Sequence, residues 1–223
     1  MAMAQPNLYK CFMKDNWCFK NTTRGIPVGI LWHDTGVNNS FLSSYVQPSS
    51  NDPDYKRMVS LLGKNDFKTD WNRNSCRVNY NAWIGKLSNK SIASIQTMPW
   101  DFRPFGCNKG KFGSCDGSTN NIFWIQIQLC QDKKNNSMYF QKIYKEACKL
   151  TAYLCKEFNI DPNGNISFNG VSVPTILCHW DAYKLGLATS HYDIYDWFPI
   201  YNTCSNLTME DVKKDVNFLL QNV

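Results

Sequence analysis

Only three histidines occur among the 223 residues of this chain, and their positions suit metal chemistry. His33 follows the apolar run Val28–Trp32, His179 follows a second apolar run, and His191 lies in a polar segment twelve residues further on. A catalytic zinc ion takes three protein ligands, favours neutral imidazole nitrogen and keeps one position open for water or substrate. The pattern therefore suggests zinc, although no signature such as HExxH supports it, and surface histidines at the ends of elements would give the same spacing.

Short strands are expected to position these histidines. Runs rich in β-branched and aromatic residues, bounded by turn residues, predict strands at Val28–Trp32, Tyr80–Leu87, Ser91–Thr97, Ile122–Leu129 and Val171–Cys178. The first strand ends at His33 and the last ends at His179. Asn169-Gly170 is a turn dipeptide that reverses the chain between Ile166–Phe168 and the last strand.

Helices are expected between these strands, at 52–62, 137–158 and 208–220. Gly63 stops the first, and Ser137 is the expected cap of the second, whose apolar residues recur at three-and-four spacing. Thr208 and Asp211 have capping-box spacing at the start of the third. Strands interleaved with helices indicate an α/β fold, with a mixed central sheet flanked by α-helices.

One domain is expected for residues 10–223, because no repeat, linker or change in composition divides them. Residues 1–9 are expected to be a disordered leader. With 43% hydrophobic and 19% charged residues the chain can bury a full core, which excludes a disordered protein. No apolar run reaches the roughly 18 residues of a membrane span, and no export signal begins the chain, so neither membrane insertion nor a signal peptide is expected.

The net charge of +6 favours an anionic partner, either a nucleic acid or an anionic cell wall. The sequence has no block of five like charges, and its aromatic residues do not alternate with basic ones as they do on a base-stacking surface. Nucleic-acid binding therefore rests on charge alone, and no nucleic-acid partner is expected.

Several segments together resemble one enzyme family. They are Gly29–Gly36, Tyr80–Gly85, the strand to Cys130, Leu177–His179, Ser190–Asp193 and Trp197–Pro199. Their order and spacing from Lys10 to Val223 are similar to those of the zinc-dependent type-2 N-acetylmuramoyl-L-alanine amidases. Further segments are similar to phage and prophage endolysins of Gram-positive bacteria, namely Tyr45–Pro48, Leu62–Lys64, Gln96–Trp100 and Leu150–Cys155.

The resemblance implies a peptidoglycan-recognition-like fold with a zinc ion at one end of a groove. It implies cleavage of the amide between N-acetylmuramic acid and the L-alanine of the stem peptide, with bacterial peptidoglycan as the substrate. His33 and His179 match the first two zinc ligands; His191 is the expected third, with Asp193 as the alternative. Tyr80 matches a family tyrosine near the reaction centre. Such a protein is expected to accumulate in the cytoplasm and to reach the wall through a holin lesion or by another secretion route.

Gln128 departs from the family pattern, because many members have at this position a glutamate that acts as general base. An amide can orient water but cannot take its proton. Three explanations stay open: the base comes from elsewhere, the sequence is an inactivated variant, or the domain binds peptidoglycan without cutting it. Asp34, Trp32, Lys184 and Thr189 are the expected substrate-binding residues, and Asp34 is also a candidate replacement base.

Overall fold

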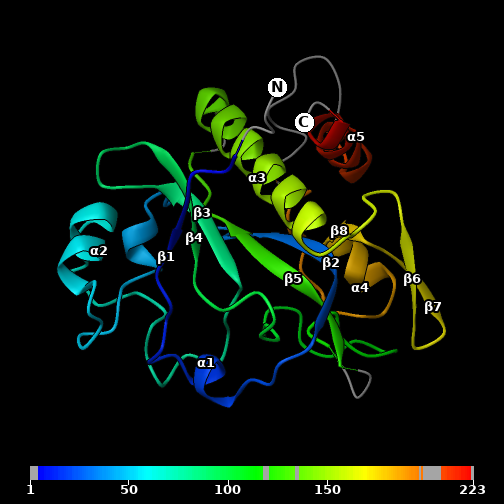
Figure 1. The fold of residues 1–223 in the computed structure, drawn as a ribbon, viewed down its shortest axis with the longest axis horizontal. Helices are drawn as coiled ribbons and strands as arrows, with labels where there is room; N and C mark the ends of the chain where they lie inside the picture. Colours follow the sequence, from blue (N-terminus) through cyan, green and yellow to red (C-terminus); the bar gives the residue numbers. More distant parts are fainter. Residues whose placement is uncertain (1–4, 118–120, 134–135, 196, 198–206, 222–223) are drawn as a thin grey trace.

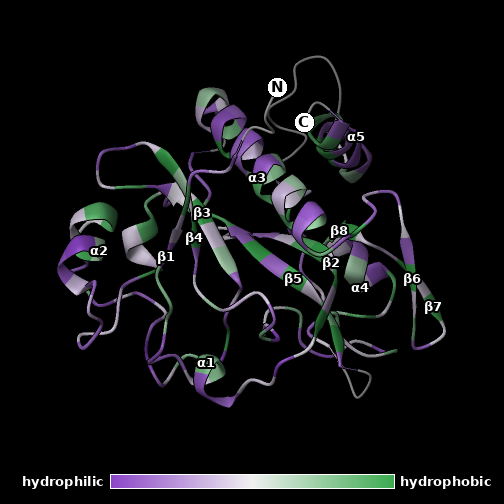
Figure 2. Ribbon diagram, in the orientation of Figure 1, coloured by the Kyte–Doolittle hydropathy of each residue, from purple (hydrophilic) through white to green (hydrophobic). Residues whose placement is uncertain are grey.

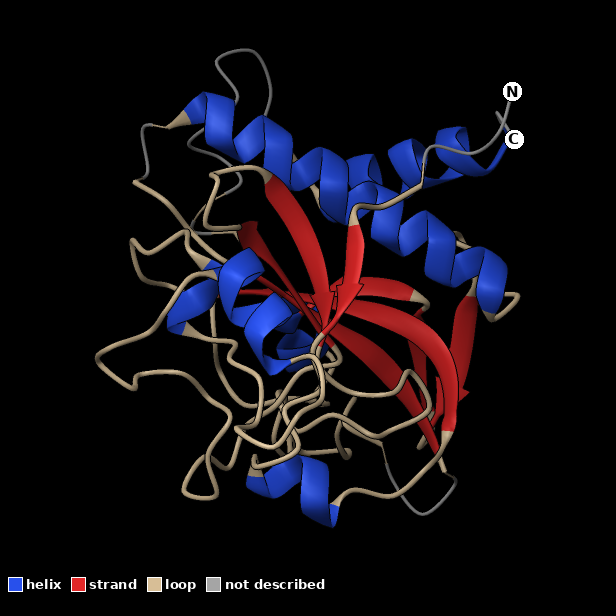
Figure 3. Ribbon diagram, turned by 60° about the vertical axis from the view of Figure 1, so that its left-hand side comes forward, coloured by secondary structure: helices blue, strands red, loops and turns tan. Residues whose placement is uncertain are grey.

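A mixed β-sheet forms the centre of the protein, with the two longest described helices on one side and long loops that carry short helices on the other (Figure 1; Figure 3). The structure is a computed structural model and describes residues 5–117, 121–133, 136–195, 197 and 207–221. The strands are β1 (Leu8–Lys10), β2 (Ile26–Asp34), β3 (Ala82–Lys86), β4 (Ile92–Gln96), β5 (Ile122–Leu129), β6 (Asn165–Phe168), β7 (Val171–Pro174) and β8 (Ile176–Cys178). The helices are α1 (Trp17–Asn21), the 3-10 turn η1 (Leu42–Ser44), α2 (Tyr55–Leu62), α3 (Ser137–Glu157), α4 (His179–Lys184) and α5 (Met209–Gln221). The predicted fold class, α/β with a mixed central sheet, is confirmed.

The main sheet has the strand order β1-β4-β3-β5-β2-β8, while β6 and β7 form a separate hairpin. Only β3 and β4 pair antiparallel; the other neighbours in the main sheet are parallel. The strands β2, β5 and β8 therefore end at the same edge, and ligands of open α/β sheets bind outside such carboxyl ends. This edge carries Asp34, Leu129 and Cys178, each at the end of its strand.

Helix α3 covers one face of the sheet because its hydrophobic residues recur every three or four positions. Figure 2 shows the resulting alternation of hydrophobic and hydrophilic residues along α3 and α5. The side chain of Asn136, one residue before the expected cap, accepts a hydrogen bond from the backbone N–H of Tyr139 and begins the helix. Trp32 is buried beneath α3, where its indole N–H donates to Thr151 Oγ at 3.0 Å.

The expected disordered leader is wrong for Leu8 and Tyr9, which lie in β1 and pair with β4. This short edge strand is stabilised by a side chain from α3: the backbone N–H of Asn7 donates to Glu146 Oε1 at 2.7 Å. Residues 1–4 lie outside the described part of the chain. The division into a leader and one domain otherwise stays a prediction.

The strand expected at Val171–Cys178 is two strands, because Thr175 leaves the ladder between them. Its backbone N–H donates to the carbonyl oxygen of Gly164 at 3.0 Å, and its hydroxyl donates to the carbonyl oxygen of Asp161 at 2.6 Å. As a result β7 pairs with β6, and β8 joins β2 in the main sheet. In the described part of the chain, no helix combines the length and the hydropathy that a membrane span requires.

Candidate metal centre and groove

Two parallel strands bring two of the three histidines together. His33 is the residue before the last of β2, and His179 begins α4 directly after β8. Because Trp32 and Cys178 are partners in the β2–β8 ladder, the residues that follow them lie side by side. Both histidines are buried, and their ring centres are 4.9 Å apart.

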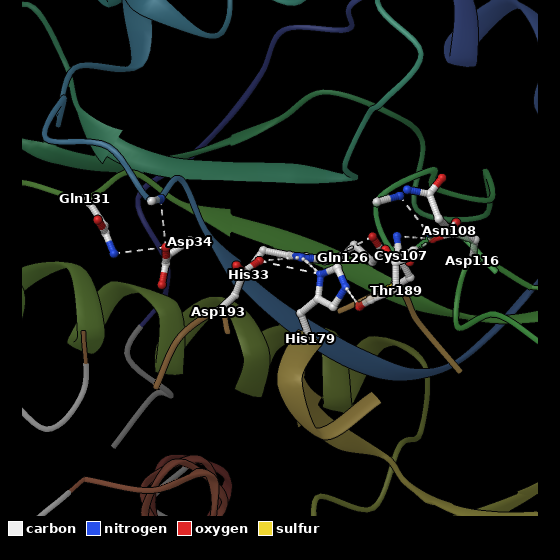
Figure 4. A network of polar contacts seen from close by, with 12 residues as sticks. His33, Asp34, Cys107, Asn108, Asp116, Gln126, Gln131, His179, Thr189 and Asp193 are labelled. Carbon is white, nitrogen blue, oxygen red and sulfur yellow. Dashed lines mark hydrogen bonds and ion pairs between the residues drawn. The ribbon is translucent and has the colours of Figure 1, made fainter. Parts of the chain in front are cut away.

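Three possible metal-binding atoms converge here. The Nδ1 atoms of His33 and His179 are 3.0 Å apart, and Asp193 Oδ2 lies 3.2 Å from the first and 3.6 Å from the second (Figure 4). Asp193 comes from the loop after α4, fourteen residues beyond His179. A strand, a helix start and a loop therefore each supply one atom.

On the side of each ring away from Asp193, the Nε2 nitrogen lies next to a hydrogen-bond acceptor. His33 Nε2 lies 3.0 Å from Gln126 Oε1, and His179 Nε2 lies 2.9 Å from the backbone oxygen of Thr189. Both oxygens can only accept, so each Nε2 carries a proton, and a neutral ring then has its lone pair at Nδ1. With both rings neutral, two imidazole lone pairs and a carboxylate face one another, an arrangement that a cation stabilises.

Charge at the site agrees with this assignment. Burial lowers the pKa of His33, which keeps its ring neutral at pH 7. Neutral imidazoles and an ionised carboxylate are the forms that bind a metal.

The spacing of the three atoms fits zinc. Zinc lies about 2.0–2.2 Å from nitrogen and oxygen ligands, so tetrahedral geometry sets such ligands about 3.3–3.6 Å apart. The observed separations of 3.0, 3.2 and 3.6 Å lie within or close to that range. Three protein ligands would leave the fourth position for water or substrate, as in catalytic zinc sites.

Cys107 offers a second possible donor set. Its sulfur and ring nitrogens of His33 and His179 lie within 4.8 Å of one another, and all three residues are buried. However, burial raises the pKa of this thiol well above its ordinary value, and its sulfur already accepts a hydrogen bond from Gln126 Nε2 at 3.3 Å. Asp193 Oδ2 lies 3.2 and 3.6 Å from the two Nδ1 atoms, and a carboxyl group ionises far more readily than a buried thiol, so Asp193 is favoured as the third ligand.

A groove of about 520 Å³ opens beside these atoms. Its lining includes His179, Asp193, Tyr80, Gln128 and Asp34. The groove therefore borders the candidate metal centre. It also contains Tyr80 and Gln128, which the sequence predicted to take part in catalysis.

Several solved structures have a similar fold. No family model matches the sequence, and no curated protein matches it either. The structure is similar to the hydrolase AmiA of Staphylococcus aureus in complex with its ligand, with a TM-score of 0.59, 15% identity, and 97% of this chain and 84% of that chain covered. It is also similar to a mutant endolysin from Bacillus subtilis, with a TM-score of 0.52, 15% identity, and 95% and 99% covered. The chain has the type-2 amidase fold.

Within this amidase fold, Gln128 and Tyr80 both face the groove next to His33. Gln128 is 3% exposed, and its Oε1 accepts no hydrogen bond from any described residue. The Tyr80 ring centre lies 4.7 Å from that of His33. Burial raises the pKa of Tyr80 well above its ordinary value, so the phenol keeps its proton and can act as a hydrogen-bond donor.

His191 lies at the mouth of the groove. Its exposed ring is centred 5.0 Å from the ring of His179. The converging atoms belong to His33, His179 and Asp193. The geometry therefore favours Asp193, the alternative third ligand, over His191. His191 is left with its ring accessible to a bound substrate.

Of the four expected substrate-binding residues, only Asp34 lines the groove. Its Oδ1 accepts hydrogen bonds from Gln131 Nε2 at 3.0 Å and from the Gly36 N–H at 2.8 Å. The prediction is wrong for Trp32, which is fully buried beneath α3, where its indole N–H donates to Thr151.

The remaining two residues also lie elsewhere. Lys184 forms an ion pair with Asp181 at 3.2 Å and lines a separate pocket next to α5, because its turn of α4 faces away from the groove. The Thr189 hydroxyl donates to the backbone oxygen of Cys107 at 3.1 Å, so its side chain supports a loop rather than facing the groove.

Sequence reasoning missed Gln126, Asp116 and Cys107. A signal existed for Gln126, because it lies two residues before Gln128 and therefore shares its face of β5. No comparable signal existed for Asp116 or Cys107, which reach the site from a loop between β4 and β5.

Proposed function

We propose that this chain is a zinc-dependent peptidoglycan amidase, which hydrolyses the amide between N-acetylmuramic acid and the L-alanine of the stem peptide. The observation that carries the proposal is the convergence of His33 Nδ1, His179 Nδ1 and Asp193 Oδ2, 3.0–3.6 Å apart, beside a groove. The similarity to a hydrolase and to an endolysin supports the choice of a cell-wall substrate. His33, His179 and Asp193 would hold the zinc ion.

When bound, zinc would polarise the scissile carbonyl and acidify the attacking water. The protein groups around it would orient the reactants and move protons. Gln128 Oε1, buried and without a partner among the described residues, would accept a hydrogen bond from the water or from the substrate amide. It would orient the group that it contacts but could not retain a proton.

Tyr80 and His191 would serve the other side of the reacting carbonyl. The protonated phenol of Tyr80 could donate a hydrogen bond to the developing oxyanion. His191, exposed beside His179, could pass a proton to the departing amine, because imidazole both takes up and releases protons. With Gln128 in place of a carboxylate, His191 and Asp34 are the groove residues best able to accept a proton.

Digestion of purified cell walls tests the proposal. We expect soluble muropeptides and new N-terminal L-alanine, both abolished by a chelator, restored by zinc and abolished in His179→Ala. Lys184→Ala, outside the groove, is the matched control and should digest walls at the wild-type rate. No release from walls of several chemistries, with zinc bound, would contradict the proposal.

A second candidate function, peptidoglycan binding without cleavage, is favoured by Gln128 alone. It predicts sedimentation of the protein with insoluble walls and no new amino termini. Cleavage clearly faster than in the chelated protein would exclude it. In either case the net charge of +6 should contribute to attraction by anionic wall polymers, so wall binding should weaken as salt rises.

A further inference from the structure

We infer that Asp116 and Gln126 are positioning residues that hold His33 in the tautomer needed for metal binding. The inference rests on the metal site proposed above, but its first measurement needs no metal. Figure 4 shows the chain of contacts running from Asp116 through Gln126 to His33, away from the side on which Asp193 lies. None of these contacts involves the groove or a substrate.

The amide of Gln126 is fixed at both ends. Its Nε2 donates to Asp116 Oδ1 at 2.7 Å and to Cys107 Sγ at 3.3 Å, while its Oε1 lies 3.0 Å from His33 Nε2. The residue is fully buried on β5, so water cannot replace any of these partners. The orientation of this amide decides whether His33 meets an acceptor or a donor.

Asp116 sets that orientation. Its Oδ1 accepts from the backbone N–H groups of Gly106 and Cys107 at 3.0 and 2.8 Å, and its Oδ2 accepts from that of Asn108 at 3.0 Å. Both oxygens of Asp116 therefore act as hydrogen-bond acceptors. Gln126 can meet such an oxygen only with its NH₂, so its own oxygen must face His33. His33 must then carry its proton at Nε2, which leaves the Nδ1 lone pair facing Asp193.

The loop between β4 and β5, which carries Asp116 and Cys107, also helps to orient His179. The carbonyl oxygen of Cys107 accepts from the Thr189 N–H at 2.9 Å and from its hydroxyl at 3.1 Å, and the carbonyl oxygen of Thr189 lies 2.9 Å from His179 Nε2. The Cys107 peptide thus connects the partner of one histidine to the partner of the other. Such contacts behind a metal ligand fix its tautomer and orientation, and their loss costs about 10–100-fold in metal affinity.

Replacing Gln126 by methionine tests the inference, because methionine keeps the length of the side chain and removes all three of its hydrogen bonds. In zinc-free protein, two-bond proton–nitrogen correlation spectra should show the Nε2–H form of His33 in the wild type and a mixture of tautomers in Gln126→Met. Zinc affinity, measured by competition with a chromophoric chelator, should fall about 10–100-fold.

Gln96→Met is the matched control. Gln96 is likewise a buried strand glutamine, 3% exposed, and its Nε2 donates to the backbone oxygen of Met98 at 2.9 Å, away from the histidines. This variant introduces the same side chain at a buried strand position and should keep the His33 tautomer and the zinc affinity of the wild type. A wild-type tautomer and wild-type zinc affinity in Gln126→Met would overturn the inference.

Gln126→Glu gives an independent test should Gln126→Met fold poorly. It places a second carboxylate in contact with that of Asp116 and removes the donated hydrogen bond that fixes the side chain, so zinc affinity should fall. Wild-type zinc affinity in Gln126→Glu would also overturn the inference. Absence of zinc binding in the wild type would instead contradict the proposed metal site and leave the zinc-free tautomer measurement valid.

Discussion

Gln128 and His33 are Cα partners on the adjacent parallel strands β5 and β2. Because partners in a parallel ladder point to the same face of the sheet, the Gln128 amide lies beside a candidate zinc ligand and lines the groove. A glutamate here would be close enough to the attacking water to take its proton. The amide keeps the shape of that side chain without its basicity.

Gln128→Glu is therefore expected to speed wall digestion. General-base catalysis contributes about 10²–10⁴-fold in rate, so the increase should fall in that range if no other base replaces it. Initial rates of release of N-terminal L-alanine measure the change. Metal content must be equal in both proteins, because a carboxylate near the site could also alter zinc loading.

Gln128→Met separates orientation of the water from proton transfer. It removes the hydrogen bonds and supplies no base, so its rate should drop below that of the wild type. If Gln128→Glu were no faster than the wild type at equal zinc content, the base would have to be sought in Asp34 or His191, both of which line the groove.

The third ligand can be identified by comparing Asp193→Ala with His191→Ala. Asp193→Ala removes one of the three converging atoms, so zinc affinity should fall by at least about 100-fold, the upper end for loss of an outer contact. His191→Ala should bind zinc normally and digest walls more slowly. The reverse pattern would restore His191 as the ligand.

Cobalt substitution separates Asp193 from Cys107. A Co²⁺ protein with nitrogen and oxygen ligands lacks the intense near-ultraviolet charge-transfer band that a thiolate ligand produces. We expect no such band, and no change in the spectrum for Cys107→Ser. A strong band that disappears in this variant would establish the donor set of His33, Cys107 and His179.

The sequence predicted β5 and α3 well, because local residue patterns determine both elements. The strand expected at Ile122–Leu129 has the same bounds in the structure, and the long helix differs by one residue at its C-terminal end. Strand β1 was missed, because a three-residue edge strand depends on its pairing with β4. The break at Thr175 was missed for a similar reason, since it depends on hydrogen bonds to Gly164 and Asp161.

The sequence could predict those candidate site residues whose type alone suggests metal binding. Few histidines at strand ends, together with the family resemblance, were enough to select His33 and His179. The choice between His191 and Asp193 depends on the path of one loop, and that path is not encoded in spacing. Trp32 failed as a groove residue because α3 covers it: its side chain is fully buried and donates to Thr151 of that helix, a tertiary contact that the local pattern does not show.

Gly106 should not tolerate a side chain. A Cβ at this position would lie 2.1 Å from Gln126 Oε1 and 2.4 Å from Tyr80 Cε1, so both residues beside His33 would have to move. Gly106→Ala should cost about 1–3 kcal/mol of stability, typical of overpacking, and should also weaken zinc binding. Gly164→Ala, with its nearest atom at 3.1 Å and outside the site, should leave zinc affinity unchanged. Normal zinc affinity in Gly106→Ala would mean that Gln126 can shift without disturbing His33.

Glu146 should make the stability of the fold depend on pH. It is buried on α3, where its Oε1 accepts hydrogen bonds from the Asn7 N–H at 2.7 Å and the Ser94 hydroxyl at 2.8 Å. Burial raises its pKa, so the folded protein binds the proton more tightly than the unfolded chain does. Stability contributed at this position is then highest below the unfolded pKa, about 4.3, and falls as the pH rises through the folded pKa.

Glu146→Gln keeps an oxygen for both hydrogen bonds and removes the buried charge. It should therefore be more stable than the wild type at pH 7, by about 1.4 kcal/mol for each unit by which the pKa is raised, and the advantage should disappear below pH 4. Denaturant unfolding at the two pH values measures the difference. Glu157→Gln, exposed on the same helix, is the control and should change stability little at either pH. Equal stability of Glu146→Gln and wild type at pH 7 would mean that the two hydrogen bonds compensate fully for burial of the charge.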